Sequence, residues 1–428
     1  MSNSSRRTFL LESASLTAGL ALASRARAAE APSNKLVVGV MGCSRGNGRG
    51  VELAREFAKL PGAEVAYVCD VDAASSEACA AEVQKTGAKA PQAVGDFRRI
   101  LDDRAVDALV IAAPDHWHAP ATILACAAGK NVYVEKPASH NAAEGELMIA
   151  AARKHQKVVQ LGTQRRSWPA IREAVEKVRG GAVGNVKLAR TWYFNARPSI
   201  GHGKQVAPPA GFDWALWQGP APERPYQDNL QPYNWHWFWH WGTGELCNNG
   251  VHMIDVCRWG LGVDYPQSVT SLGGKYAHDD DNETPDTNTA TFDFGGRAIT
   301  WECRNWSPHT KLDPQYDLAF FGDKGTLAID GDGYVILDLA GKELAKQRGD
   351  QGTAIHLQNF LSAVRGDDAP HAEIEEGHKS TLLCHLGNIA YRVGRTLKTD
   401  PASGHIVGDD DAQKLWSREY QDGWAPQV

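Results

Sequence analysis

The stretch that decides the fold of this 428-residue chain is Lys35–Asp70, KLVVGVMGCSRGNGRGVELAREFAKLPGAEVAYVCD. It opens with a short β-branched apolar run, Lys35 to Met41, which is the pattern of a buried parallel strand. A glycine-rich turn over 42–50 follows, then a helical pattern from Val51 to Leu60 and a second apolar run from Glu64 to Cys69. This order of strand, glycine turn, helix, strand and acid predicts a dinucleotide-binding fold.

The glycine turn and the acid after the second strand also predict the cofactor. Glycines let the backbone approach a pyrophosphate, and free N–H groups at the helix start meet its charge. Asp70 can accept hydrogen bonds from the adenosine ribose and would repel a 2′-phosphate, so NAD is favoured over NADP. The turn departs from the usual fingerprint because Ser44 stands where the second glycine is expected. The residues predicted here to hold the dinucleotide are Gly42, Cys43, Ser44, Arg45, Gly46 and Asp70.

Bulk properties limit the alternatives. A chain of 428 residues is too long for one compact core, so two domains are expected. The net charge of -6 gives no sign of the basic face that a nucleic-acid partner requires. The eight cysteines form no C-x-x-C pair and no zinc-spaced cluster, which predicts buried thiols and leaves one disulfide open. The acidic run 278–283 fits a solvated loop better than a cation site, so we predict no metal.

Residues 1–28 have the form of a twin-arginine signal peptide. Ser5-Arg-Arg-Thr-Phe-Leu10 is followed by a modestly apolar stretch over 10–23 and an A-x-A cleavage site at 26–28. That stretch is too short and too polar to span a membrane. We expect export to the periplasm, or otherwise out of the cytoplasm, in the folded state with a cofactor already bound. The alternative is a disordered basic terminus of a cytoplasmic protein.

A second group of motifs carries a resemblance to a known family. An apolar run over 105–113 is followed by Pro114-Asp-His-Trp-His118, a helix expected over 119–128, and a strand over 131–134 that ends in Glu135-Lys136-Pro137. This arrangement resembles the glucose–fructose oxidoreductase, inositol dehydrogenase and MocA family, of which Glu-Lys-Pro is the most specific mark. The similarity continues through the stretches 160–166, 244–259, 322–327 and 356–365, and so covers nearly the whole mature chain.

The resemblance implies an α/β NAD-binding Rossmann domain at 35–164 and an α+β domain for substrate binding and oligomerisation at 165–428. Strand-like runs beyond Arg166 follow one another mostly without crossover helices, which predicts an open, mainly antiparallel sheet with helices on one face. The expected strands are 186–194, 266–274, 287–294, 297–306, 316–322, 325–331 and 334–338, and the expected helices are 171–179, 251–261, 356–365 and 377–397. In this family the uncovered sheet face often forms a dimer interface, so a homodimer or homotetramer is expected.

The resemblance also implies catalytic residues. Hydride transfer from a secondary alcohol needs a base for the hydroxyl proton, and the lysine of Glu-Lys-Pro, here Lys136, takes that role. The stretch 242–255 holds the family's histidine as His252, but the aspartate one helical turn earlier is replaced by Asn248. His252 would then work without a charged neighbour, or Asp255 or Glu245 would substitute. Further cofactor contacts are implied for Pro114, Trp117, His118, Glu135, Lys136 and Gln164.

Substrate contacts are expected between these halves. Arg165 and Arg166 follow the last Rossmann strand, although either could be a solvated surface residue. Four tryptophans alternate over 234–241, which suggests an extended segment that serves either as a sugar-stacking platform or as an aromatic plug. The Pro- and Gly-rich loop 197–234 would frame the cleft. The predicted substrate-binding residues are Arg165, Arg166, Tyr193, Arg197, Trp239 and Asp255.

These features predict an exported oxidoreductase with tightly bound NAD(H) that acts on a secondary hydroxyl of a sugar or polyol. Because the periplasm has no known free NAD pool, the cofactor would have to be restored within the cycle by reducing a second sugar. A redox-neutral glycoside hydrolase acting through a transient 3-keto sugar is the alternative. Such hydrolases often lack the Glu-Lys-Pro lysine, and Lys136 therefore favours oxidoreduction. A non-catalytic sugar-binding or assembly protein is the third reading.

Overall fold

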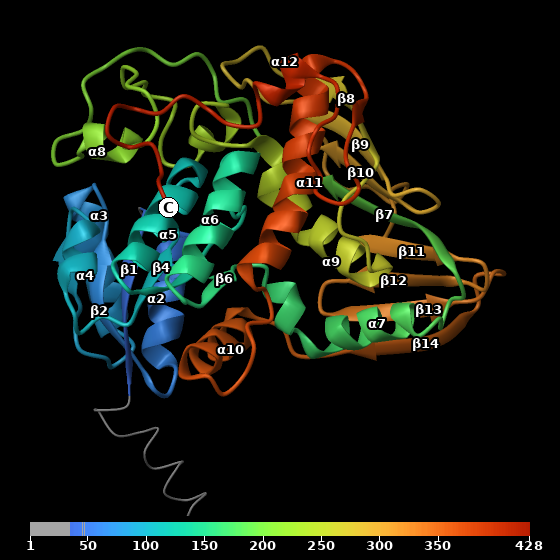
Figure 1. Ribbon diagram of the computed structural model, residues 1–428, viewed down its shortest axis with the longest axis horizontal. Coiled ribbons are helices and arrows are strands. Elements are labelled where there is room, and N and C mark those ends of the chain that lie inside the picture. The colour runs from blue at the N-terminus through green and yellow to red at the C-terminus, as the bar shows by residue number, and fades with distance from the viewer. Residues whose placement is uncertain (1–34, 45, 47) are drawn as a thin grey trace, which may run out of the picture.

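The first domain is a Rossmann fold. The computed structural model describes residues 35–44, 46 and 48–428, so the signal-peptide prediction and Arg45 lie outside the described residues. Six parallel strands stand in the order β3-β2-β1-β4-β5-β6 (Figure 1). They are β1 (Leu36–Met41), β2 (Ala63–Cys69), β3 (Gln92–Val94), β4 (Ala108–Ile111), β5 (Asn131–Val134) and β6 (Val159–Leu161). The order reverses between β1 and β4, and a cleft is expected outside their carboxyl ends.

Helices cover both faces of this sheet, as crossover connections between parallel strands require. They are α2 (Arg49–Lys59), α3 (Ala73–Gln84), α4 (Arg98–Asp102), α5 (Asp115–Ala127) and α6 (Ala142–Lys154). Helix α5 begins four residues before the predicted start at 119. The reason is that Pro114 has a fixed φ suited to the helix start and Asp115 suits the first turn electrostatically. The Lys136–Pro137 peptide is cis.

The second domain is built on a nine-stranded open sheet in the order β14-β13-β12-β11-β7-β10-β9-β8-β15. All neighbours are antiparallel except β7 and β10, which run parallel. This confirms the predicted mainly antiparallel sheet. The strands are β7 (Val186–Phe194), β8 (Ser268–Gly274), β9 (Thr287–Asp293), β10 (Ala298–Arg304), β11 (Leu318–Gly322), β12 (Thr326–Asp330), β13 (Gly333–Leu337), β14 (Glu343–Arg348) and β15 (Leu397–Lys398).

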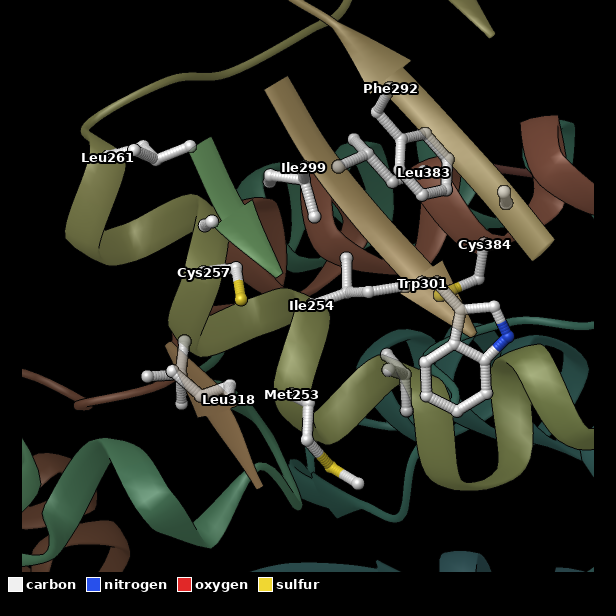
Figure 2. Close-up of a cluster of buried hydrophobic side chains, with 14 of the residues drawn as sticks. Met253, Ile254, Cys257, Leu261, Phe292, Ile299, Trp301, Leu318, Leu383 and Cys384 are labelled. Atoms are coloured by element: carbon white, nitrogen blue, oxygen red, sulfur yellow. The ribbon is translucent and has the colours of Figure 1, made fainter. Parts of the chain in front are cut away.

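Helices α7 (Pro169–Arg179), α9 (Val251–Leu261) and α11 (Ile374–Val393) cover one face of this sheet, while α10 (Thr353–Arg365) returns to pack on α2 (Figure 1). Their apolar residues form the largest core, part of which is drawn in Figure 2. There Ile254 of α9 points toward Trp301 of β10, and both side chains are fully buried. Burial of one such large side chain contributes about 1.5–3 kcal/mol, so this core fixes α9 rigidly to the sheet.

A long connection leaves the second domain and crosses over the first. It runs from the end of β7 to the π-helical turn η4 (Leu246–Gly250), and it contains α8 (Trp214–Gln218) and the 3₁₀ turn η3 (Asn234–Trp237). In Figure 1, α8 lies above the Rossmann domain rather than beside the second sheet. The predicted extended tryptophan segment is wrong, because 234–241 folds as η3 followed by turns. Its tryptophans therefore point in different directions.

Other sequence predictions concern the cysteines, metals and membrane. All eight cysteines are free and buried, which confirms the predicted buried thiols. Within the described ranges, no group of three or more His, Cys, Asp or Glu side chains is arranged to hold a metal. None of the helices described in the structure is both long and apolar enough to cross a bilayer.

Candidate active site

A cavity of about 770 Å³ lies at the carboxyl ends of the Rossmann strands and extends to the start of α9. The volume is that of a typical small-molecule or cofactor site. The sequence-predicted residues that line it are Gly42, Ser44, Asp70, Pro114, Trp117, His118, Glu135, Lys136, Gln164, Asn248 and His252. Residues predicted from both halves of the chain therefore meet at one cavity.

The turn after β1 has the shape that a pyrophosphate requires. Gly42 has a φ of 89°, and a Cβ on it would lie 2.4 Å from Ala113 N, so only glycine fits this position. A Cβ on Gly46 would meet nothing within 4 Å, which leaves open space above the turn. Ser44 N donates to Asp70 Oδ2 at 2.7 Å and joins the turn to β2. Cys43, in contrast, is fully buried with its thiol 3.5 Å from Cys69 O.

Arg49, which was not among the residues predicted from the sequence, stands at the start of α2 and lines the cavity. Its Nε donates to Glu135 Oε1 at 2.8 Å, while its Nη2 is buried without a hydrogen-bond partner among the described residues. An unpartnered guanidinium nitrogen beside an open glycine turn and a helix N-terminus fits a phosphate group. The signal was present in the sequence, since Arg49 lies within the glycine-rich turn.

Asp70 ends β2 at the other side of this cradle. Its Oδ1 accepts from Asp72 N at 2.9 Å and its Oδ2 from Ser44 N. Burial raises the pKa of Asp70, although these backbone donors oppose the shift. Each carboxylate oxygen retains a further lone pair for a ribose hydroxyl. The residues that would hold the dinucleotide therefore fit an NAD molecule.

The turn that carries Lys136 is held from behind by α5. The His118 ring lies between two carbonyl oxygens, with Nδ1 2.5 Å from Pro137 O and Nε2 2.8 Å from Ala113 O. Glu135 accepts from Gln164 Nε2 at 3.2 Å as well as from Arg49. These contacts fix the Glu-Lys-Pro turn at the junction of the two domains.

Lys136 is paired with Asn248 rather than with a carboxylate. Its Nζ donates to Asn248 O at 2.8 Å and to Asn248 Oδ1 at 3.0 Å. Burial lowers the pKa of Lys136, and the negative charges of Glu135 and Asp115 only partly oppose the shift. A neutral lysine amine has two N–H donors and one lone pair. The two oxygens of Asn248 match those donors and leave the lone pair free to take a proton.

The Asn248 amide has one defined orientation. Its Nδ2 donates to Tyr233 Oη at 3.0 Å and to Glu245 Oε1 at 3.4 Å, so its Oδ1 must face Lys136. Glu245 is itself buried and held by Arg197, whose Nε donates to Glu245 Oε2 at 2.7 Å. Glu245 is therefore the acid near the site, and it contacts Asn248 rather than His252. Arg197 acts on this network and does not line either cavity described here.

His252 lies between two cavities. Beyond it is a second cavity of about 560 Å³, and His252 and Gln164 line both. Burial lowers the pKa of His252 well below its usual range, and the charge of Lys136 adds to this shift. No side chain in the described part of the chain hydrogen-bonds to the ring. His252 is therefore a neutral imidazole whose nitrogens are available to a bound molecule.

The second cavity is lined by aromatic and polar side chains. Arg165 and Tyr193, both predicted to bind substrate, line it. Arg165 Nη2 donates to Asp317 at 2.6 Å, while its Nη1 is buried without a partner among the described residues. Aromatic faces beside polar groups suit the C–H faces and hydroxyls of a sugar. The aromatic side chains of the lining are Trp168, Trp192, Tyr193, Phe194, His309 and Tyr316.

Arg166 and Asp255 do not reach either cavity. Arg166 Nη2 and Nε donate to the two oxygens of Asp255, both at 2.8 Å, and the side chains are only 5% and 1% exposed. Ser380 Oγ donates to Asp255 Oδ1 at 2.6 Å. This geometry does not support the predicted substrate contacts, because the pair is satisfied within the protein and ties α9 to α11.

Trp239 also lies away from the linings of these two cavities. Its Nε1 donates to Glu283 O at 3.1 Å, and the Arg392 guanidinium lies 5.2 Å from its ring centroid. Trp235 is the member of the tryptophan run that lines the first cavity, whereas Trp241 packs in a cluster with Trp217. The segment thus combines an aromatic plug with one cavity-facing ring.

Comparisons with known proteins agree with this arrangement. The profile of the oxidoreductase family with an NAD-binding Rossmann fold, Gfo/Idh/MocA, matches residues 36–163, and that of its C-terminal alpha/beta domain matches 183–426. An uncharacterized oxidoreductase of Bacillus subtilis is 27% identical over 390 residues, 90% of this chain and 99% of that protein.

Two other proteins mark the range of similarity. An inositol 2-dehydrogenase of Rubrobacter xylanophilus is 34% identical over 165 residues, 38% of this chain and 45% of that protein. The structure of an aldose-aldose oxidoreductase from Caulobacter crescentus has the same fold, with a TM-score of 0.65 and 21% identity over 85% of this chain and 99% of that one. Because the two family profiles cover both domains, this chain belongs to the Gfo/Idh/MocA family of NAD-dependent oxidoreductases.

Proposed function

We propose that the protein is an exported oxidoreductase that keeps NAD(H) tightly bound and acts on a secondary hydroxyl of a sugar or polyol. The observation that carries the proposal is the pairing of Lys136 Nζ with both oxygens of Asn248 beside His252, at the junction of the two cavities. The first cavity would hold the dinucleotide and the second the body of the sugar. Export rests on the twin-arginine pattern of the first 28 residues.

In this mechanism, bound NAD would supply the hydride acceptor for the carbinol carbon. Lys136 takes the hydroxyl proton on its lone pair, because its lowered pKa makes the neutral amine accessible. The neutral His252 ring binds a hydroxyl from the other side and orients the substrate. Glu245 and Tyr233 hold the Asn248 amide, and through it they hold Lys136 in position.

The redox-neutral hydrolase remains a second candidate because the second cavity extends beyond His252. Its aromatic lining, which includes Trp168 and Tyr316, has room for a ring that is not itself oxidised. A glycoside could place its leaving group there. An oxidoreductase acting on a disaccharide would use the same space, so the reaction itself must decide between them.

The experiment begins with the nicotinamide released by heat denaturation of purified protein. We expect about one NAD(H) per chain, and the absence of both released cofactor and binding of added NAD would overturn the proposal. The protein is then incubated with pairs of monosaccharides and, separately, with aryl glycosides. Formation of an oxidised and a reduced sugar together supports oxidoreduction. Release of aglycone with no net redox change would replace it with the hydrolase.

A further inference from the structure

The long connection between the domains closes one side of the first cavity. We define the cover segment as residues 209–236. It belongs in sequence to the second domain, yet it contributes a large share of the cavity lining. The lining residues at its two ends are Pro209, Phe212 and Leu216 at one end, and Tyr233, Trp235 and His236 at the other.

The cover segment is bonded to the loop that follows β2. Ala73 N donates to Gly211 O at 3.2 Å, and Asp213 N donates to Val71 O at 2.9 Å. These two bonds flank an antiparallel bridge between Asp72 and Phe212. The attachment point lies two residues beyond Asp70, the acid that would bind the adenosine ribose. The segment is thus joined to the Rossmann domain at the adenosine end of the cavity.

The segment is also held from behind by α5. His116 Nε2 and Trp117 Nε1 both lie 2.9 Å from Trp217 O. Trp214 stacks on Trp217 with ring centroids 4.9 Å apart, and Trp241 packs edge-on to both. Because these aromatic contacts are extensive, the position of the segment over the cavity is a built part of the fold.

We propose that the cover segment encloses the adenosine half of bound NAD and must lift before the cofactor can exchange. This inference rests on the NAD site of the proposed function. Apolar side chains of the segment, Phe212 and Leu216, line the cavity together with Val71 and Phe97 of the Rossmann domain. A flat adenine ring suits such a slot. The cofactor is then retained through turnover instead of leaving after each hydride transfer.

The same segment reaches the catalytic end. Tyr233 Oη accepts from Asn248 Nδ2, and Asn248 in turn holds Lys136. Lifting the segment would remove Tyr233 from Asn248 while it opens the adenosine slot. Cofactor exchange and catalysis therefore require different positions of one segment, and a molecule with its cofactor exposed has an incomplete site.

The first test measures exchange of bound NAD with isotopically labelled NAD, by mass spectrometry of the cofactor released on denaturation. We expect slow exchange in the unaltered protein and about tenfold faster exchange in Leu216→Ala, since this substitution removes most of one leucine's apolar contact. Leu344→Ala, on the exposed edge strand β14, is the matched control and should exchange as the unaltered protein does. Exchange equally fast in all three proteins would overturn the inference.

The second test locks the segment. Asp72 and Phe212 form the closer, non-hydrogen-bonded kind of antiparallel pair, a spacing of about 4.5 Å that a disulfide can bridge. In the double variant Asp72→Cys, Phe212→Cys, exchange should be slower after oxidation than after reduction of the same sample. Equal rates would mean that NAD leaves without the segment lifting. If the unaltered protein binds no NAD, the proposed function itself is refuted. The two failures are therefore distinguishable.

Discussion

Two buried polar clusters lie along α9, and they are built from similar residues. At its start, Lys136, Asn248, Glu245 and Arg197 form one cluster, and further along, Asp255, Arg166 and Ser380 form the other. Each contains an arginine that forks onto a buried carboxylate. Only the first adjoins the cavities, and there Lys136 keeps a position open for a substrate proton.

The difference shows that burial and ion pairing alone do not identify a functional charge. In the second cluster both carboxylate oxygens of Asp255 already accept hydrogen bonds from donors within the protein. Asp255 therefore needs no donor from a ligand. In the first cluster the hydrogen-bond partners of Lys136 are the side-chain amide and the backbone carbonyl of Asn248. Neither carries a negative charge that would balance a protonated amine. An amine at a cavity wall whose pKa is lowered by burial is suited to proton transfer.

The largest expected effect comes from breaking the second cluster, in which Arg166 is paired with Asp255. Asp255→Ala removes the closest carboxylate from the buried Arg166, whose remaining ion pair is with Glu376 at 3.6 Å, and should lower the free energy of unfolding by about 3 kcal/mol. Urea denaturation measures the change. Glu302→Ala removes the partner of Arg190 in a surface pair and should cost less than about 1 kcal/mol. If both variants lose the same small amount, the Arg166–Asp255 pair is not a structural tie.

Substitutions in the first cluster should instead change the turnover rate. Lys136→Ala should reduce kcat by about 100-fold or more, the usual scale for losing a positioned acid–base group. Lys136→Met should reduce it equally while preserving the packing of the side-chain stem. Bound NAD, measured after denaturation, should remain near one per chain in both. Turnover that survives in Lys136→Met would place the base elsewhere.

His252 should have a smaller effect because its ring is neutral and orients substrate by hydrogen bonding. His252→Ala should reduce kcat/KM by about tenfold, the scale of one hydrogen bond. The acid limb of the pH profile should stay in place, since the pKa of His252 lies well below its usual range and Lys136 is the titrating group. Disappearance of that limb in His252→Ala would exchange the two roles.

The smallest expected effect comes from introducing a carboxylate beside Lys136, so that the first cluster resembles the second. Asn248→Asp places a carboxylate against Lys136 and should raise the lysine pKa by about one unit or more. Oxidation requires the neutral amine, so activity rises with pH through this pKa. A higher pKa therefore moves the acid limb of kcat/KM to higher pH. An unmoved limb would show that Lys136 is not the group that titrates.

The Rossmann strands β1, β2, β4 and β5 could be predicted because they are apolar runs bounded by glycine, proline or acid signals, whereas the short and mostly exposed β3 could not. The apolar runs predicted at 35–41 and 64–69 form β1 and β2. The strand β14 could not be predicted, because all six of its residues are exposed and their polar sequence shows no alternation. The parallel pairing of β7 with β10 was equally hidden, because it joins residues more than a hundred positions apart.

The site was predicted less completely, for two physical reasons. Lys136, Asn248 and His252 lie in motifs, so the sequence predicted that they belong to the site but not which residues they contact. Whether an arginine binds substrate depends on its partner, and the partner of Arg166 lies 89 residues away. Alternating tryptophans suggested an extended segment, but a spacing of two also occurs in a 3₁₀ turn followed by irregular turns. The cover segment carries no motif, but its Pro- and Gly-rich composition predicted a loop that frames the cleft, and residues of the segment do line the first cavity.

The tryptophans around the first cavity would make the redox state of a bound nicotinamide cofactor detectable by fluorescence. Trp117, Trp217 and Trp235 line the cavity. A reduced nicotinamide absorbs light in the region where indole emits, whereas the oxidised ring does not. The excited tryptophans would therefore transfer energy to NADH. Their fluorescence would fall each time oxidation of the substrate reduces the cofactor. The protein carries its own fluorescent indicator, through which a single half-reaction could be followed without any coupled assay.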